Sequence, residues 1–162
     1  MTGSRLEFVR TCVLLMPLLL GGCTFYDYTY DLLFATLVPT SKISISVVDR
    51  ANDNSPIAFD LVFISNRTPL EETLSKMSAT DWFAQREQML RDYKDDMVVL
   101  HWEVVPGQVI ATQPIARPGS KLRYAAFLFA GYKGPGAHRY RVTDEDPLVI
   151  MADLRDFTVS KK

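Results

Sequence analysis

The strongest constraint on the fold is a period of two among the apolar residues, which recurs in short segments along most of the chain. Residues 42–49 and 57–65 both place an apolar side chain at every second position, which is typical of a strand with one face in a core. Clusters of Gly, Pro, Asn and Asp separate these segments about every ten residues. The pattern continues at 97–105, 108–115, 121–132, 139–142 and 148–154. Seven or so short strands of this kind predict a mainly β fold, an antiparallel β-sandwich.

Residues 66–97 interrupt the alternation and predict a helical insertion between the second and third strands. Ser78 is a capping residue for one helix start, and Asp81 follows three positions later. After it, Trp82, Phe83 and Met89 recur at helical spacing and form one apolar stripe. We expect this stripe to pack on the sheet, because such stripes belong to a core far more often than to a ligand site.

Two further segments are assigned to the core. Residues 121–132 are the most apolar of the chain and predict a central strand that is covered on both faces. Trp102 alternates with Val98, Leu100 and Val104, which places its side chain in the core.

The N-terminal residues predict a lipoprotein signal peptide. Arg5 and Arg10 precede an apolar run over 11–20, which is too short to span a bilayer as a helix. The run ends in Leu-Gly-Gly-Cys, which resembles the lipobox of bacterial lipoproteins, so Cys23 is the expected acylation site. Thr24 follows it, where lipoproteins of the inner membrane usually carry Asp, which implies sorting to the outer membrane. The alternative is a plain secreted protein with a chance cysteine.

This interpretation divides the chain into three parts. Residues 1–22 are the signal peptide, 23–40 are the lipidated N-terminus with an aromatic tether, and 41–162 are a periplasmic β-sandwich domain. The tether is rich in Tyr, Phe and Leu, so it either lies against the lipid surface or packs onto the domain.

Cysteine content and charge exclude several classes of function. Cys12 leaves with the signal and Cys23 carries lipid, so no disulfide, cysteine nucleophile or thiolate metal site is expected. The formal net charge is −1, with 18 basic and 19 acidic residues. This balance gives no electrostatic reason to expect nucleic acid as a partner.

Catalytic patterns are not found in the sequence. His101 and His138 are the two histidines, without the spacing of a metal site, and His101 is expected on the surface. Acidic residues cluster at 95–96 and 144–146, where element ends use them as caps and in turns. We therefore expect no enzyme, metal, cofactor or small-molecule substrate, and interpret the chain as a domain that acts through its end loops.

Several segments together resemble the TssJ family, the outer-membrane lipoproteins of type VI secretion systems. They are the lipobox cysteine, the strand at 43–49, the Asn/Asp/Ser-Pro loop at 52–56, the strand at 59–64, the Trp82-Phe83 pair, the Val-Val-Pro-Gly turn at 104–107 and the apolar strand at 124–132.

The resemblance implies a transthyretin-like sandwich that docks the secretion membrane complex at the outer membrane. It implies as partner the periplasmic domain of the TssM-type inner-membrane protein, bound largely through the loop after the first strand. Carried onto this chain, that loop spans 50–56, and its composition favours polar contact rather than burial. The partner-binding residues implied in this way are Arg50, Asn52, Asp53, Asn54 and Ser55.

Two alternatives remain open on the sequence. One is a periplasmic lipoprotein that binds a ligand or inhibits an enzyme with the same end loops. The other is an envelope hydrolase that uses the acidic clusters, which would require two carboxyl groups held across a cleft.

Overall fold

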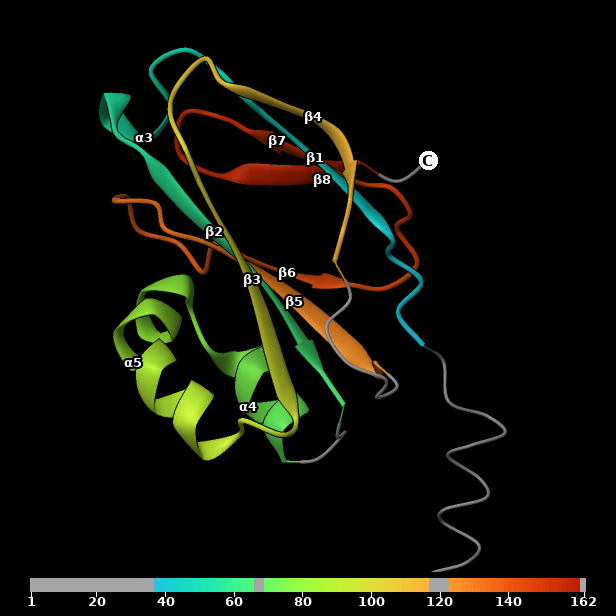
Figure 1. Ribbon diagram of the computed structural model, residues 1–162. Coiled ribbons are helices and arrows are strands. Elements are labelled where there is room, and N and C mark those ends of the chain that lie inside the picture. The colour runs from blue at the N-terminus through green and yellow to red at the C-terminus, as the bar shows by residue number, and fades with distance from the viewer. Residues whose placement is uncertain (1–36, 66–68, 117–122, 161–162) are drawn as a thin grey trace, which may run out of the picture. The chain divides into compact units, whose positions relative to one another are not determined.

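The computed structural model describes residues 37–65, 69–116 and 123–160, in which eight β-strands form two facing sheets (Figure 1). Sheet A has the strand order β4-β1-β7-β8, and sheet B has the order β3-β2-β5-β6. The strands are β1 (Lys42–Val47), β2 (Ile57–Ile64), β3 (Met97–Val104), β4 (Val109–Pro114), β5 (Ala125–Ala130), β6 (Arg139–Val142), β7 (Leu148–Ala152) and β8 (Phe157–Ser160). The predicted β-sandwich is confirmed, and β8 is a strand that the sequence pattern did not predict.

The predicted signal peptide at 1–22, the acylation site Cys23 and the tether up to residue 36 lie outside the described residues. Among the residues that are described, no helix is both long enough and apolar enough to cross a membrane.

The last residues of the predicted tether belong to the folded unit. The Val38 side chain is buried, and its amide donates to the Arg123 carbonyl at 3.0 Å. Thr40 is also buried and donates from its hydroxyl to the Glu145 carbonyl at 2.7 Å. The fold therefore needs residues that precede the boundary expected at residue 41.

One strand pair departs from the antiparallel prediction. β1 and β7 are parallel neighbours, with Ile43 opposite Leu148 and Val47 opposite Ala152, while every other strand pair in the described residues is antiparallel. Alternation in a sequence indicates which face of a strand is buried, but it does not indicate the neighbour or its direction. The predicted antiparallel sandwich is confirmed at the other strand pairs, and β1–β7 is its one parallel exception in the described residues.

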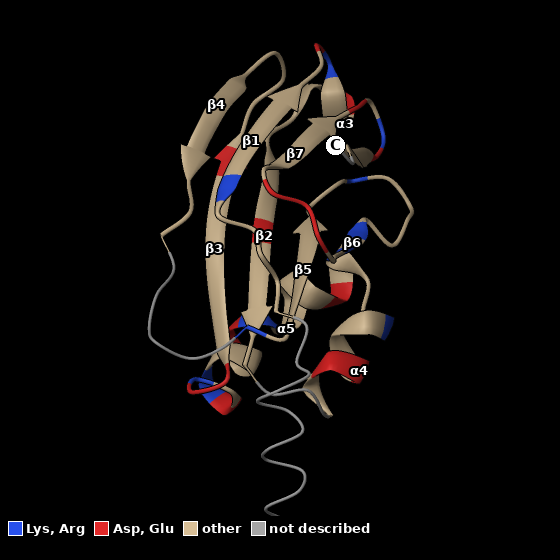
Figure 2. Cartoon of the chain, turned by 90° about the vertical axis from the view of Figure 1, so that its right-hand side faces the viewer, with Lys and Arg blue, Asp and Glu red and all other residues tan. Residues whose placement is uncertain are grey.

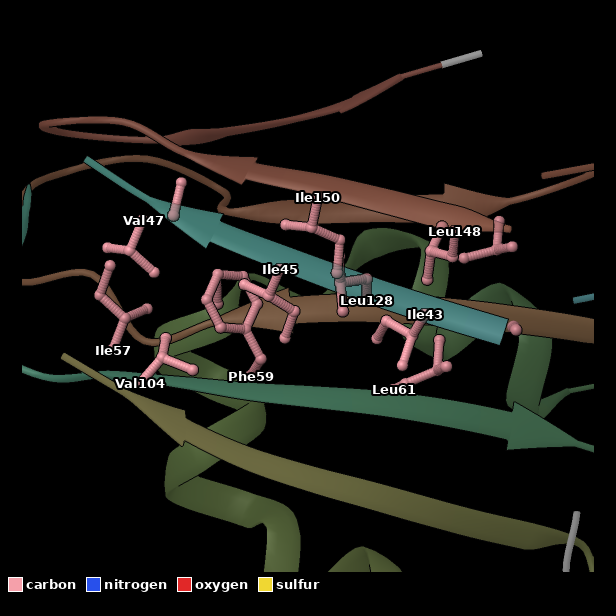
Figure 3. Packing of buried hydrophobic residues seen from close by; sticks show 14 of the residues in the cluster. Ile43, Ile45, Val47, Ile57, Phe59, Leu61, Val104, Leu128, Leu148 and Ile150 are labelled. Atoms are coloured by element: carbon pink, nitrogen blue, oxygen red, sulfur yellow. The ribbon is translucent and has the colours of Figure 1, made fainter. Parts of the chain in front are cut away.

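The inner faces of the two sheets form the main core (Figure 3). The predicted alternation is confirmed, because the inward residues of β1 and β2 are almost wholly buried while Ser44 and Ser46 remain partly exposed. Phe59 also meets Phe157 of β8 edge to face, with ring centroids 5.8 Å apart. The labelled core residues are Ile43, Ile45, Val47, Ile57, Phe59, Leu61, Val104, Leu128, Leu148 and Ile150.

Helices α4 (Leu70–Lys76) and α5 (Ala79–Asp92) cover the outer face of sheet B, which confirms the predicted insertion (Figure 1). Ser78 caps α5, and its hydroxyl accepts from the Asp81 amide at 3.1 Å. The Trp82 ring stacks on Phe129 of β5 at 5.1 Å. Because helices lie on one side and sheet A on the other, β5 is buried on both faces, as its apolar sequence predicts.

Trp102 faces the core, as predicted, but its side chain is only half-buried. β3 is an edge strand of sheet B, and a side chain there has a neighbouring strand on one side only. The prediction identified the correct face, and the strand's position at the sheet edge reduced the burial.

A buried carboxylate ties α5 to the sheet. Asp60 lies in the middle of β2 with no exposed surface and accepts a hydrogen bond from the Trp82 indole at 2.8 Å. Arg86 Nε lies 3.3 Å from the same carboxylate, and His101 Nδ1 lies 2.6 Å from its other oxygen. His101 keeps 40% of its side chain exposed, as predicted for a surface histidine, but its partner was not foreseen. Burial of a charge is tolerated here because three groups compensate it.

Asp60→Ala should lower the free energy of unfolding by about 2–4 kcal/mol, because the buried indole N–H of Trp82 loses its acceptor and the ion pairs are lost. Urea denaturation of the chain from Leu37 onward would measure the loss. Glu87→Ala, on the exposed side of the same helix, should change stability by less than about 0.5 kcal/mol. Equal stabilities for the two variants would contradict a structural role for Asp60.

Candidate functional site

The loop predicted to bind a partner forms a short turn with left-handed backbone, α3 (Ala51–Asn54). The φ angles are 61° at Arg50, 50° at Asn52, 53° at Asp53 and 57° at Asn54. Most residues lose about 1–2 kcal/mol in this conformation, and Asn and Asp tolerate it best after Gly. The Asn-Asp-Asn sequence therefore allows a turn that few other sequences would adopt.

Asn52 is buried and holds the turn in place, so it cannot offer its side chain to a partner. Its Nδ2 donates to the Pro56 carbonyl at 2.9 Å, and its Oδ1 accepts from the Lys133 amide at 2.7 Å. Its own amide donates to the Leu154 carbonyl at 2.9 Å. The expectation that the whole loop is free for polar contact is wrong at Asn52, because these bonds join three segments that are distant in sequence.

The other predicted contact residues lie closer to solvent. Arg50, Asp53 and Asn54 are exposed, and Ser55 is half-buried. The Lys133 ammonium donates to the Ser55 hydroxyl, so Ser55 is joined to the same neighbouring loop as Asn52. Three of the five predicted residues therefore present their side chains freely.

A second segment, residues 131–138 between β5 and β6, packs beside α3. His138 is buried in it, with Nδ1 3.0 Å from Asp156 Oδ1 and Nε2 3.0 Å from the Gly134 carbonyl. Each ring nitrogen therefore faces an acceptor oxygen, and the two contacts fix the orientation of the ring. Gly136 is required here, because a Cβ atom would lie 2.5 Å from the His138 ring. His138 therefore has a structural part in shaping the loop.

The third segment, residues 153–156 between β7 and β8, is fixed through Tyr132. The Tyr132 hydroxyl lies 3.1 Å from the Asp153 carbonyl and 2.8 Å from the Asp156 carbonyl, to which it can donate. Burial, and then the Asp156 and Asp153 charges, raise the pKa of the Tyr132 hydroxyl well above its ordinary value. The hydroxyl therefore stays protonated and keeps its role as donor.

Together, α3 and residues 131–138 and 153–156 form what we call the loop-end surface (Figure 1). A depression of about 200 Å³ lies between them, with Asp53, Pro135, Leu154 and Arg155 among its lining residues. Acidic and basic residues gather around α3, whereas much of the neighbouring strand surface is uncharged (Figure 2). Leu154 is 53% exposed in this charged setting.

The acidic cluster at 144–146 is structural. Asp146 accepts from the Ser41 amide and hydroxyl, both at 2.8 Å, and these bonds lower the pKa of the Asp146 carboxyl. Glu145 is buried and accepts from the Tyr140 hydroxyl at 2.6 Å; burial and this bond raise the pKa of Tyr140 to about 12. These acids hold the β6–β7 connection against the start of β1, as expected for acids at element ends.

Within the described residues, no group of three or more His, Cys, Asp or Glu side chains could hold a metal ion. The loop-end surface instead combines exposed charges, the large exposed hydrophobic side chain of Leu154 and a shallow depression on a rigid support. Such a surface is suited to binding another macromolecule, because loops on a fixed scaffold can vary without disturbing the core.

Sequence reasoning did not identify Leu154, Arg155 or the 131–138 segment as part of this surface. Leu154 was assigned to the end of a strand at 148–154, whereas β7 ends at Ala152. The turn signal at 134–136 was recognised, but no sequence pattern indicates which loops meet. The sequence indicates this surface only through the general expectation that the end loops form the variable surface of the domain.

No protein-family model matches the chain, and a search of curated proteins finds no significant match. Solved structures do resemble it. Lip of Serratia marcescens, a membrane-bound component of the Type VI secretion system, matches with a TM-score of 0.52 and 11% identity over 75% of this chain and 96% of that chain. A chain in the structure of the TssM C-terminal domain from EAEC matches with a TM-score of 0.52 and 9% identity over 75% of this chain and 98% of that chain.

A third structure, the T6SS lipoprotein TssJ1 from Pseudomonas aeruginosa, gives a TM-score of 0.49 and 13% identity over 76% of this chain and 98% of that chain. At such identities, the likeness establishes the fold. The predicted TssJ-like sandwich is confirmed in that sense by the match to Lip.

Asn52→Ala should lower the free energy of unfolding by about 2–3 kcal/mol, because the buried Asn52 side chain loses two hydrogen bonds and Ala is unfavourable at positive φ. Asn52→Gly should lose less, since Gly accepts the backbone conformation and removes only the bonds. Comparing the thermal unfolding of the two variants would separate the contribution of the lost hydrogen bonds from that of the unfavourable backbone conformation. Asp53→Gly serves as a control and should leave Tm nearly unchanged; a loss as large as that of Asn52→Ala would contradict the assignment.

Proposed function

We propose that the chain is a lipid-anchored envelope component of a type VI secretion system, held in the outer membrane through acylated Cys23. In this proposal its periplasmic domain binds the periplasmic domain of a TssM-type inner-membrane protein through the loop-end surface. The observation that carries the proposal is the likeness of its fold to Lip, a membrane-bound component of such a system.

Two independent features support this proposal. The lipobox at 20–23 is what a lipid-anchored protein requires, and the fold is shared with Lip, a membrane-bound component of a Type VI secretion system. The loop after β1 has an unusual left-handed backbone, and strained backbone in folded proteins concentrates at functional sites. The strain is maintained by the buried bonds of Asn52, which keep the exposed side chains in one arrangement.

We propose as contacts only those residues of the implied set whose side chains can reach a partner. Arg50, Asp53 and Asn54 are the proposed contacts, because their side chains are exposed. Asn52 supports the turn and is no longer proposed as a contact. Ser55 is held by Lys133 and is proposed as a contact at the edge of the surface.

The anchoring part of the proposal predicts that Cys23→Ser leaves an unacylated protein. Each buried CH₂ of an acyl chain contributes roughly 0.8 kcal/mol, and stable anchoring needs two or more chains or signals. The variant should therefore no longer float with outer-membrane vesicles in a density gradient, whereas the parent chain should. A Cys23→Ser protein that still floats would show that another part of the chain binds lipid.

The docking part predicts that the double substitution Asp53→Gly with Asn54→Gly weakens binding to the TssM periplasmic domain at least tenfold, which is about 1.4 kcal/mol. Gly retains the positive φ at both positions, so the backbone should persist while the side chains are lost. Isothermal titration calorimetry with the unacylated domain would measure the affinity.

The matched control is Glu87→Ala with Arg91→Ala, two exposed positions on α5. Binding of this control should equal that of the parent. Equal weakening in both variants would mean a general defect, and unchanged binding in the Gly variant would place the interface elsewhere. A parent domain that does not bind the TssM domain would refute the docking role.

A further inference from the structure

We infer that the apolar anchor of the docking contact is Leu154, and that the depression beside it receives one bulky apolar side chain of the partner. Asp53 and Arg155, at the rim, would pair with a basic and an acidic side chain that flank this residue in the partner. The partner segment is thus a protein loop with an apolar residue between opposite charges. This inference rests on the proposed function and assigns the centre of the contact to the β7–β8 loop.

Leu154 is an exposed apolar side chain on a fixed backbone. Its carbonyl accepts from the Asn52 amide at 2.9 Å, and its amide donates to Asp153 Oδ1 at 2.7 Å. The Asp153 amide in turn donates to the Asp156 carbonyl at 2.8 Å, which closes the loop on itself. A leucine held in this way loses little backbone entropy on binding, which favours its use as an anchor.

A single exposed leucine is ordinary on a protein surface, so the residues that surround Leu154 matter more than its exposure. Val109 and Met151 are also exposed, but they lie within strands on the outer face of sheet A, in register with Ser46. Leu154 instead lies in a loop and lines the depression of about 200 Å³ together with Pro135 and Tyr132. It also lines a larger, more open hollow of about 530 Å³ that follows residues 153–158.

The charges at the rim have no partner within the described chain. Asp53 and Arg155 both line the depression and are exposed, and neither forms an ion pair with another described residue. Exposed charges of opposite sign beside an exposed apolar side chain match the usual anatomy of an interface, with an apolar core and a polar rim. They would also orient the partner segment, because a reversed segment would bring like charges together.

The test is binding kinetics between the chain with Cys23→Ser and the periplasmic domain of the TssM-type partner. Leu154→Ser should weaken the affinity at least tenfold, mainly through faster dissociation, because an apolar anchor is lost. Leu154→Met should bind nearly as the parent does. Arg155→Gln should slow association and reduce its dependence on salt, since a rim charge acts chiefly on the approach of the partner.

Met151→Ser is the matched control, because Met151 and Leu154 are each 53% exposed and the substitution removes a similar apolar area. It should leave binding unchanged. Parent-like binding by Leu154→Ser, in a domain whose Asp53 and Asn54 substitutions do weaken binding, would overturn the inference and leave the docking proposal standing. If the parent itself does not bind the TssM domain, both are overturned.

Discussion

The structure depends on the burial of β2 and β5 on both of their faces. The inner faces of these strands meet sheet A, and their outer faces meet α4 and α5, so two apolar clusters share the same two strands. Burial of this kind is the dominant favourable contribution to folding, and it requires near-continuous apolar sequence in the strands concerned. Asp60 is the exception in β2, and its burial is possible because Trp82, Arg86 and His101 surround its carboxylate.

The rigid sandwich gives the end loops a precise arrangement. Asn52 joins α3 to the loops that contain Lys133 and Leu154, while Tyr132 and His138 join those two loops to each other. The network consists of side chains and of backbone amides and carbonyls from the three loops. The network explains how a turn with several positive φ angles can persist, since the surrounding structure compensates its unfavourable backbone.

The outer face of sheet B and the loop-end surface differ in what they expose to solvent. The outer face of sheet B is largely covered by α4 and α5 in the described residues, and His101 of β3 remains partly exposed there. The loop-end surface combines charge, an apolar side chain and a depression on a fixed backbone. Those properties are typical of binding surfaces.

The sequence by itself determined the strands other than β8, the inserted helices, the face that these strands bury and a loop after β1, because these follow from local periodicity and conformational preference. Tertiary structure decided what depends on contacts between distant residues: the parallel pairing of β1 with β7, the half-burial of Trp102 at a sheet edge and the partners of Asp60. Tertiary structure also buries Asn52, which was expected to be a contact residue, and places Leu154 beside Asn52. Local sequence cannot specify these features, since hydrogen bonds and burial between segments distant in sequence are fixed only when those segments pack together.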